Sequence, residues 1–200
     1  QHHRLFQPLH QRPWHLGTML DTPIQKHWLD AFVRLFELCR PKPDEIIVIV
    51  MESQSRPVNL MLAELALRQL AVSFDTLRVE TKPANTRPII RSTGASNALN
   101  GETAIVARLS AADLVIDLTV EGLMHSVQTP GILAAGTRIM TISNEHPDIL
   151  ARLAPDPDLK PIVRDAVARC RLAAQMQVTS AAGSELSIAM ANTVTVGVWG

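Results

Sequence analysis

Four short apolar runs recur along the chain, and polar turns and stretches with helical spacing separate them. The runs cover residues 45–51, 72–80, 114–118 and 138–142. The first and third are too short for helices and too uniformly apolar for half-exposed strands, so we expect strands that are buried on both faces. Between the runs, helical spacing is clear over residues 24–36, 58–70 and 97–111. The alternation predicts an α/β fold, a Rossmann-like, doubly wound and mostly parallel sheet of about four to five strands.

The two ends of the chain depart from this alternation. Residues 1–20 are rich in histidine and have no clean periodicity, and we interpret them as a leader or tag-like tail. Residues 21–175 form the expected α/β domain, closed by an amphipathic helix over 162–173. Short strand patterns at 176–179, 186–190 and 194–199 are interpreted as junction strands that lead toward a second domain that this chain lacks. A free apolar strand at that end would suit a homo-oligomer.

Composition excludes several classes of function. With 46% hydrophobic and 19% charged residues, the chain can bury a sizeable core. Nineteen basic and nineteen acidic residues give no electrostatic case for nucleic acid or an anionic membrane. Cys39 and Cys170 lie in predicted helices without a CxxC motif, so we interpret them as buried thiols of a reducing compartment. The expected location is the cytoplasm, and the expected partner is a small-molecule substrate.

Two polar segments are candidates for binding, and each has a plainer interpretation. The turn after the first strand lacks the glycines that a dinucleotide or nucleotide phosphate needs. Ser53 in this turn lies at the ligand edge of the sheet and is a candidate substrate-binding residue, although a hydroxyl here also suits the start of a helix. Residues 144–148 (NEHPD) resemble a metal or acid–base cluster, but their place before a helix favours an N-terminal cap.

His125 is the candidate for acid–base chemistry. It follows the strand at 114–118, and in open α/β sheets ligands bind beyond the carboxyl ends of the strands. An imidazole titrates near neutral pH and can therefore move a proton there. The alternative is a structural histidine that is hydrogen-bonded within its loop. The residues alone leave both interpretations open.

A longer pattern around His125 resembles a known family. Residues 112–140, ADLVIDLTVEGLMHS followed by GILAAGTRIM, are similar to a segment of the 2,5-dihydroxypyridine 5,6-dioxygenases, which are related in fold to aminopeptidase T-like metallopeptidases. In that family a strand A-D-L-V-V-D precedes leucine-histidine-serine, a helix and G-T-R-I-L. Residues 147–153 (PDILARL) and 182–185 (AGSE) resemble two further family segments. The similarity extends over about residues 35–190.

The resemblance implies roles for individual residues. His125 takes the place of the family histidine that bonds a ring hydroxyl of the substrate and moves a proton as the ring opens. Met124 stands where the family has leucine, and with Ser126 it would contact the substrate. The cofactor implied is Fe(II) for the full-length enzyme, or Zn or Co if the chain is a peptidase instead.

One departure from the family concerns the metal. The family's ligands come mostly from a C-terminal domain, and one is a glutamate just after a V-T pair. Here Val194 and Thr195 are followed by Val196, without an acid. We therefore expect this segment alone to bind no catalytic metal. Three hypotheses stand: the N-terminal domain of a ring-cleaving dioxygenase, an aminopeptidase T-like hydrolase, or a non-catalytic α/β binding or assembly module.

Overall fold

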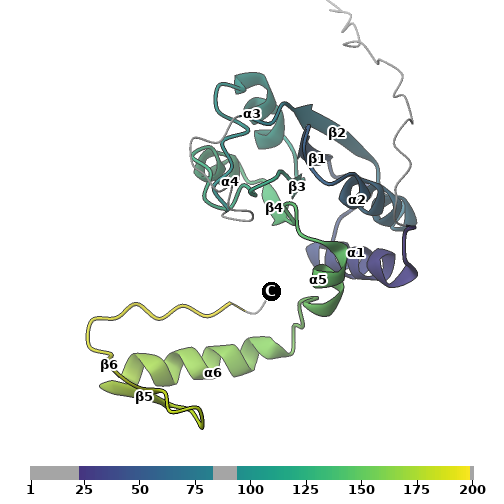
Figure 1. Cartoon of the computed structure of the whole chain (residues 1–200). Helices are drawn as coiled ribbons and strands as arrows, with labels where there is room; N and C mark the ends of the chain where they lie inside the picture. The colour runs from purple at the N-terminus through teal and green to yellow at the C-terminus, as the bar shows by residue number, and fades with distance from the viewer. Residues whose placement is uncertain (1–22, 83–93, 199–200) are drawn as a thin grey trace, which may run out of the picture.

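The computed structural model describes residues 23–82 and 94–198, and twelve helices and strands lie in these ranges (Figure 1). The expected tail at 1–20 lies outside the described residues. In chain order the elements are α1 (Lys26–Cys39), β1 (Ile47–Glu52), α2 (Pro57–Gln69), β2 (Phe74–Val79), α3 (Thr103–Ser110), β3 (Leu114–Leu118), α4 (Thr129–Ala134), β4 (Arg138–Thr141), α5 (Pro147–Arg152), α6 (Leu159–Leu172), β5 (Gln175–Thr179) and β6 (Glu185–Ala189).

The predicted α/β architecture is confirmed. Four strands form a parallel sheet in the order β2-β1-β3-β4. The chain moves outward from β1 to β2, then crosses back over β1 to β3 and continues outward to β4. The direction of winding therefore reverses between β1 and β3. A reversal of this kind leaves a crevice at the carboxyl ends of the two strands, where open sheets bind ligands.

Both faces of the sheet are covered, as the uniformly apolar strands predict. Ile47, Ile49 and Ile116 belong to the cluster that packs against α1 and α2, whereas Val48 and Val115 belong to the cluster on the α3 and α4 side. Every residue of β1 and β3 is buried. Figure 1 shows the two pairs of helices on opposite sides of the sheet.

Some predicted helix boundaries and one predicted strand differ from the structure. The first helix covers Lys26–Cys39, whereas the helical spacing in the sequence runs over residues 24–36. The helix expected over 97–111 covers only Thr103–Ser110, because residues 98–101 form turns and Gly101 adopts a φ of +80°. Residues 194–198 form no strand. Instead they lie along α6, and Gly197 packs so closely that a Cβ there would come within 2.5 Å of Val163 Cγ1.

The loss of this strand removes the physical reason for a dimer formed through its edge, and the homo-oligomer stays an untested prediction. Both cysteines are free thiols and are partly exposed, where burial was predicted. The Cys39 thiol donates a hydrogen bond to the Leu35 carbonyl at 3.4 Å. Desolvation raises the pKa of Cys39, and the Arg138 charge counteracts this rise.

The segment after α5 differs from the sheet layer. Helix α6 contains no buried residue, and β5 and β6 form a separate antiparallel hairpin. Figure 1 shows α6 and the hairpin standing away from the four-stranded sheet. Apolar side chains stay exposed along this segment, including Ile162 at 64% and Leu172 at 89%. Among the described residues, no helix combines the length and the apolar character that crossing a membrane requires.

Candidate functional site

His125 lies in the loop between β3 and α4, beyond the carboxyl end of a central strand. Its side chain is exposed, and its backbone N–H donates to the Gly94 carbonyl. Gly94 has a φ of +73°, and a Cβ there would lie 3.1 Å from His125 Cδ2. The imidazole therefore rests against a backbone that carries no side chain. Among residues 23–82 and 94–198 the ring has no hydrogen-bond partner.

Met124 and Ser126 flank this histidine but point in different directions. Met124 is 62% exposed and also contacts the Gly94 position through its Cβ. Ser126 is buried, and its hydroxyl donates to Gln128 Oε1 at 2.7 Å. The Gln128 amide in turn donates to Asn100 Oδ1 at 2.9 Å. Met124 thus lies beside His125, whereas Ser126 links the start of α4 to the segment before α3 through Gln128 and Asn100.

Ser53 directly follows β1 and lies next to the end of β2, away from β3. Its backbone N–H donates to the Val79 carbonyl, and its hydroxyl accepts from the Thr81 N–H at 3.0 Å. These bonds join the carboxyl ends of β1 and β2, whereas His125 follows β3. The structure therefore brings His125 and Met124 together, and it gives Ser53 a role in closing the turn after β1.

The NEHPD segment at 144–148 forms the predicted helix cap. His146 is the N-cap of α5, and its Nδ1 accepts from the Asp148 N–H at 3.2 Å. The Asp148 carboxylate also accepts from Trp28 Nε1 at 2.5 Å and lies 3.1 Å from His27 Nε2. The Trp28 and His27 hydrogen bonds lower the pKa of Asp148 below its ordinary value. This cluster joins α5 to α1.

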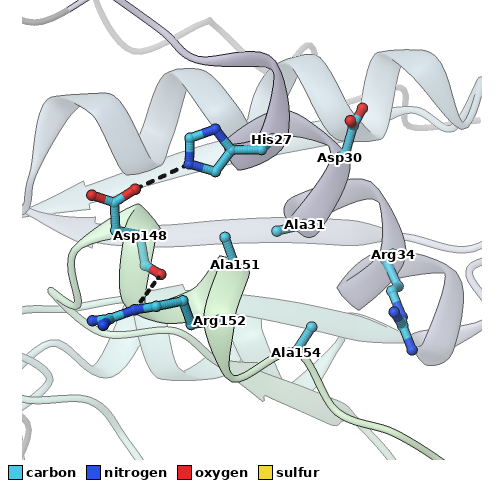
Figure 2. A pocket seen from close by; sticks show the side chains of 8 residues that line it. All are labelled: His27, Asp30, Ala31, Arg34, Asp148, Ala151, Arg152 and Ala154. Carbon is cyan, nitrogen blue, oxygen red and sulfur yellow. Dashed lines mark hydrogen bonds and ion pairs between the residues drawn. The ribbon is translucent and has the colours of Figure 1, made fainter.

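A cavity of about 660 Å³ lies between the same two helices (Figure 2). Its floor consists of Ala31, Ala151 and Ala154, and charged side chains surround it. Figure 2 shows Arg34 and Arg152 directed apart, and the Arg152 Nε donates to the Asp148 carbonyl at 3.4 Å. The charges do not converge on one point, so the cavity has the character of a surface cleft between packed helices.

The resemblance implies an iron centre, and the described residues decide whether this chain can hold it. Within residues 23–82 and 94–198, no three His, Cys, Asp or Glu side chains are grouped closely enough to hold a metal ion. An iron centre needs several such ligands. The residues that the structure describes therefore do not fit an iron site by themselves.

Three further residues at this edge were missed by the sequence analysis. Gly94 supports His125, and the buried carboxylates of Glu52 and Asp117 accept hydrogen bonds from the loop that leads to it. Glu52 directly follows the apolar run at 45–51, and Asp117 interrupts the apolar run at 114–118. That contrast was the one signal available in the sequence. Their partners could not be read from it.

Taken together, the winding reversal between β1 and β3 and the exposed imidazole beyond β3 define a Rossmann-like α/β domain with a ligand-binding edge. Residues 27–200 match the family model of 2,5-dihydroxypyridine 5,6-dioxygenase (NicX), and the chain belongs to this family.

Two relatives support the assignment. The chain is 30% identical over 159 residues to the 2,5-dihydroxypyridine 5,6-dioxygenase of Pseudomonas putida KT2440. The aligned region covers 77% of this chain and 44% of that protein. A solved structure of 2,5-dihydroxypyridine dioxygenase from Pseudomonas putida KT2440 superimposes with a TM-score of 0.67 at 27% identity, over 84% of this chain and 48% of that one. The chain thus spans about half the length of these relatives. The matches favour neither the aminopeptidase T-like hydrolase nor the non-catalytic module.

Proposed function

We propose that this chain supplies the N-terminal domain of an Fe(II)-dependent, ring-cleaving dioxygenase. Its substrate would be 2,5-dihydroxypyridine or a similar hydroxylated nitrogen heterocycle, and His125 would be its acid–base residue. The observation that carries the proposal is the exposed His125 imidazole, which a backbone hydrogen bond to Gly94 fixes at the carboxyl edge of the sheet. Family membership supports the reaction class.

The chemistry asked of His125 is the movement of one proton. A hydroxylated ring gives up electrons more readily once a hydroxyl has lost its proton. A neutral imidazole nitrogen within hydrogen-bond distance of that hydroxyl can take the proton and return it to a product oxygen later. Met124 would cover the apolar part of the ring beside the imidazole. No step is assigned to iron, because the described residues do not form a site for it.

The rest of the chain would complete this domain and connect it to a second one. Residues 21–175 would form the N-terminal domain, and residues 176–200 would form the junction toward a C-terminal metal-binding domain. The exposed apolar side chains of α6 and the hairpin support this assignment, since such surfaces mark interaction sites. The free thiols of Cys39 and Cys170 support a cytoplasmic location.

The test is oxygen uptake by the complete product of the gene that encodes this chain. The protein would be purified anaerobically, loaded with Fe(II) and mixed with 2,5-dihydroxypyridine in an oxygen electrode. We expect one O2 to be consumed per ring, together with loss of the ring's ultraviolet absorbance. Hydroquinone has the same spacing of hydroxyls without the ring nitrogen and serves as the matched control substrate, with slower uptake expected.

Two results would count against the proposal. An iron-loaded protein that consumes no oxygen with any hydroxylated pyridine would exclude the dioxygenase activity. Release of amino-terminal residues from peptides in the presence of Zn or Co would assign the chain to the hydrolase alternative.

A further inference from the structure

Two buried carboxylates lie on neighbouring strands at the edge of the sheet that carries His125. Glu52 ends β1 and is 2% exposed, and Asp117 lies in β3 and is fully buried. The strands are neighbours, with Val50 opposite Asp117 in the register. Among the described residues neither acid forms a salt bridge. Buried carboxylates without a cationic partner require hydrogen-bond donors, and here most of the donors come from the loop after β3.

Asp117 accepts hydrogen bonds from both ends of the turn at residues 119–123, the first part of that loop. Its Oδ1 accepts from the Thr119 N–H at 2.9 Å and from the Thr119 hydroxyl at 2.6 Å. Its Oδ2 accepts from the Leu123 N–H at 2.6 Å. Gly122 between them has a φ of +81°, which allows the chain to turn. One carboxylate thus fixes residues 119–123 as a compact turn, two residues before His125.

Glu52 fixes the middle of the same turn and connects it to a second segment. Its Oε1 accepts from the Val120 N–H at 2.8 Å and from the Ser96 hydroxyl at 3.2 Å. The Ser96 N–H donates to the Gly122 carbonyl at 2.8 Å. Residues 94–96 are thereby held against the turn, and Gly94 in this segment accepts the His125 N–H. The Gly94 N–H in turn donates to the Glu121 carbonyl at 2.6 Å, so the segment that accepts the His125 N–H is bonded to the turn that the two acids hold.

We propose that Asp117 is a positioning residue for His125, because its carboxylate, beside Glu52, fixes the turn that places the imidazole at the substrate edge. This inference rests on the proposed function for its catalytic consequence. Its structural content, the coupling of Asp117 to His125, does not depend on the substrate. Desolvation raises the pKa of Asp117, and hydrogen bonds from Thr119, Leu123 and Thr141 oppose that rise.

The decisive substitution is Asp117→Asn, which keeps the size of the side chain but turns one oxygen into a donor that faces N–H donors. Asp113→Asn is the matched control. Asp113 lies one residue before the same strand, and its Oδ2 accepts from the Ile46 N–H at 2.8 Å at the opposite edge of the sheet. Both changes remove a carboxylate that is bonded to a backbone N–H. Only Asp117 is bonded to the turn that leads to His125.

The first readout is nuclear magnetic resonance of this 200-residue chain, without iron or substrate. In Asp117→Asn we expect the His125 amide to exchange with solvent at least about tenfold faster and its ring resonances to shift, because the local opening free energy falls. Asp113→Asn should leave both signals as in the wild type. Lower stability with an unchanged His125 amide and ring would overturn the proposal, since Asp117 would then be structural only.

The second readout is turnover by the iron-loaded complete protein. A misplacement of an acid–base group by about 1 Å lowers turnover by about 100-fold, so Asp117→Asn should lower kcat by about 10- to 100-fold and change KM less. If the wild-type protein has no oxygenase activity, the proposed function fails, while the resonance experiment still decides the coupling.

A gentler variant keeps the test decisive if Asp117→Asn does not fold. Thr119→Val keeps the shape of the side chain and the backbone N–H, but it removes the hydroxyl that donates a hydrogen bond to the Asp117 carboxylate. We expect the same change in the His125 amide and ring at smaller size. A folded Thr119→Val chain with wild-type His125 signals would contradict the proposal.

Discussion

Neighbouring residues on β3 provide a quantitative test of the two-sided sheet. Val115 and Ile116 are both fully buried, in different core clusters on opposite faces. Val→Ala removes two carbons and Ile→Ala removes three, each worth about 0.8 kcal/mol of transfer free energy. With the free energy of the cavities added, we expect Val115→Ala to cost about 2–3 kcal/mol and Ile116→Ala about 3–4 kcal/mol of unfolding free energy.

The assay is equilibrium unfolding in urea, followed by far-ultraviolet circular dichroism. Val127→Ala is the matched control, because it deletes the same two carbons at a site that is 86% exposed. It should change the unfolding free energy by less than about 0.5 kcal/mol. If Val115→Ala behaves like Val127→Ala while Ile116→Ala is costly, the face toward α3 and α4 is not packed, and the reasoning about a doubly covered sheet is refuted.

Two further predictions concern the surroundings of the site and of α5. Gly94→Ala places a methyl group at a φ of +73° against the His125 ring. It should therefore lower turnover by a larger fraction than it lowers the urea midpoint of unfolding. Unchanged kinetics would contradict the contact. Hydrogen bonds from Trp28 and His27 lower the pKa of Asp148 in the folded protein. The ionised carboxylate therefore stabilises the fold fully at pH values above its ordinary pKa of 3.8, and this stabilisation is lost as the pH falls through the lower pKa of the folded state. Asp148→Asn should therefore lose less stability than the wild type between pH 6 and pH 3 in urea titrations, and equal losses would refute this.

The sequence was sufficient for the sheet because burial on both faces leaves a direct trace. The apolar runs at 45–51 and 114–118 became β1 and β3, and their neighbours became the edge strands β2 and β4. His125 could be placed for the same reason, since a residue that follows a central strand must lie at the carboxyl edge. Its exposure and its contact with Gly94 could not be predicted, because Gly94 lies 31 positions earlier in the chain.

The errors arose where tertiary contact outweighs local pattern. The alternating residues 194–198 suggested a strand, but Gly197 packs on Val163 and Val167 of α6 and the segment stays extended without a partner strand. Glu52 and Asp117 received no role from the sequence. Their importance depends on hydrogen bonds such as Glu52 Oε1 to the Val120 N–H, across a separation of 68 residues. No local signal in a single sequence reports such a bond.

The most direct test of the central claim is the effect of His125→Ala on the iron-loaded complete protein. Because general acid–base catalysis contributes about 100- to 10,000-fold, kcat for oxygen consumption with 2,5-dihydroxypyridine should fall by about that factor. Iron content should stay unchanged, and Val127→Ala should retain wild-type turnover. A His125→Ala protein with kcat close to that of the wild type would contradict the assignment of His125 as the proton-moving residue.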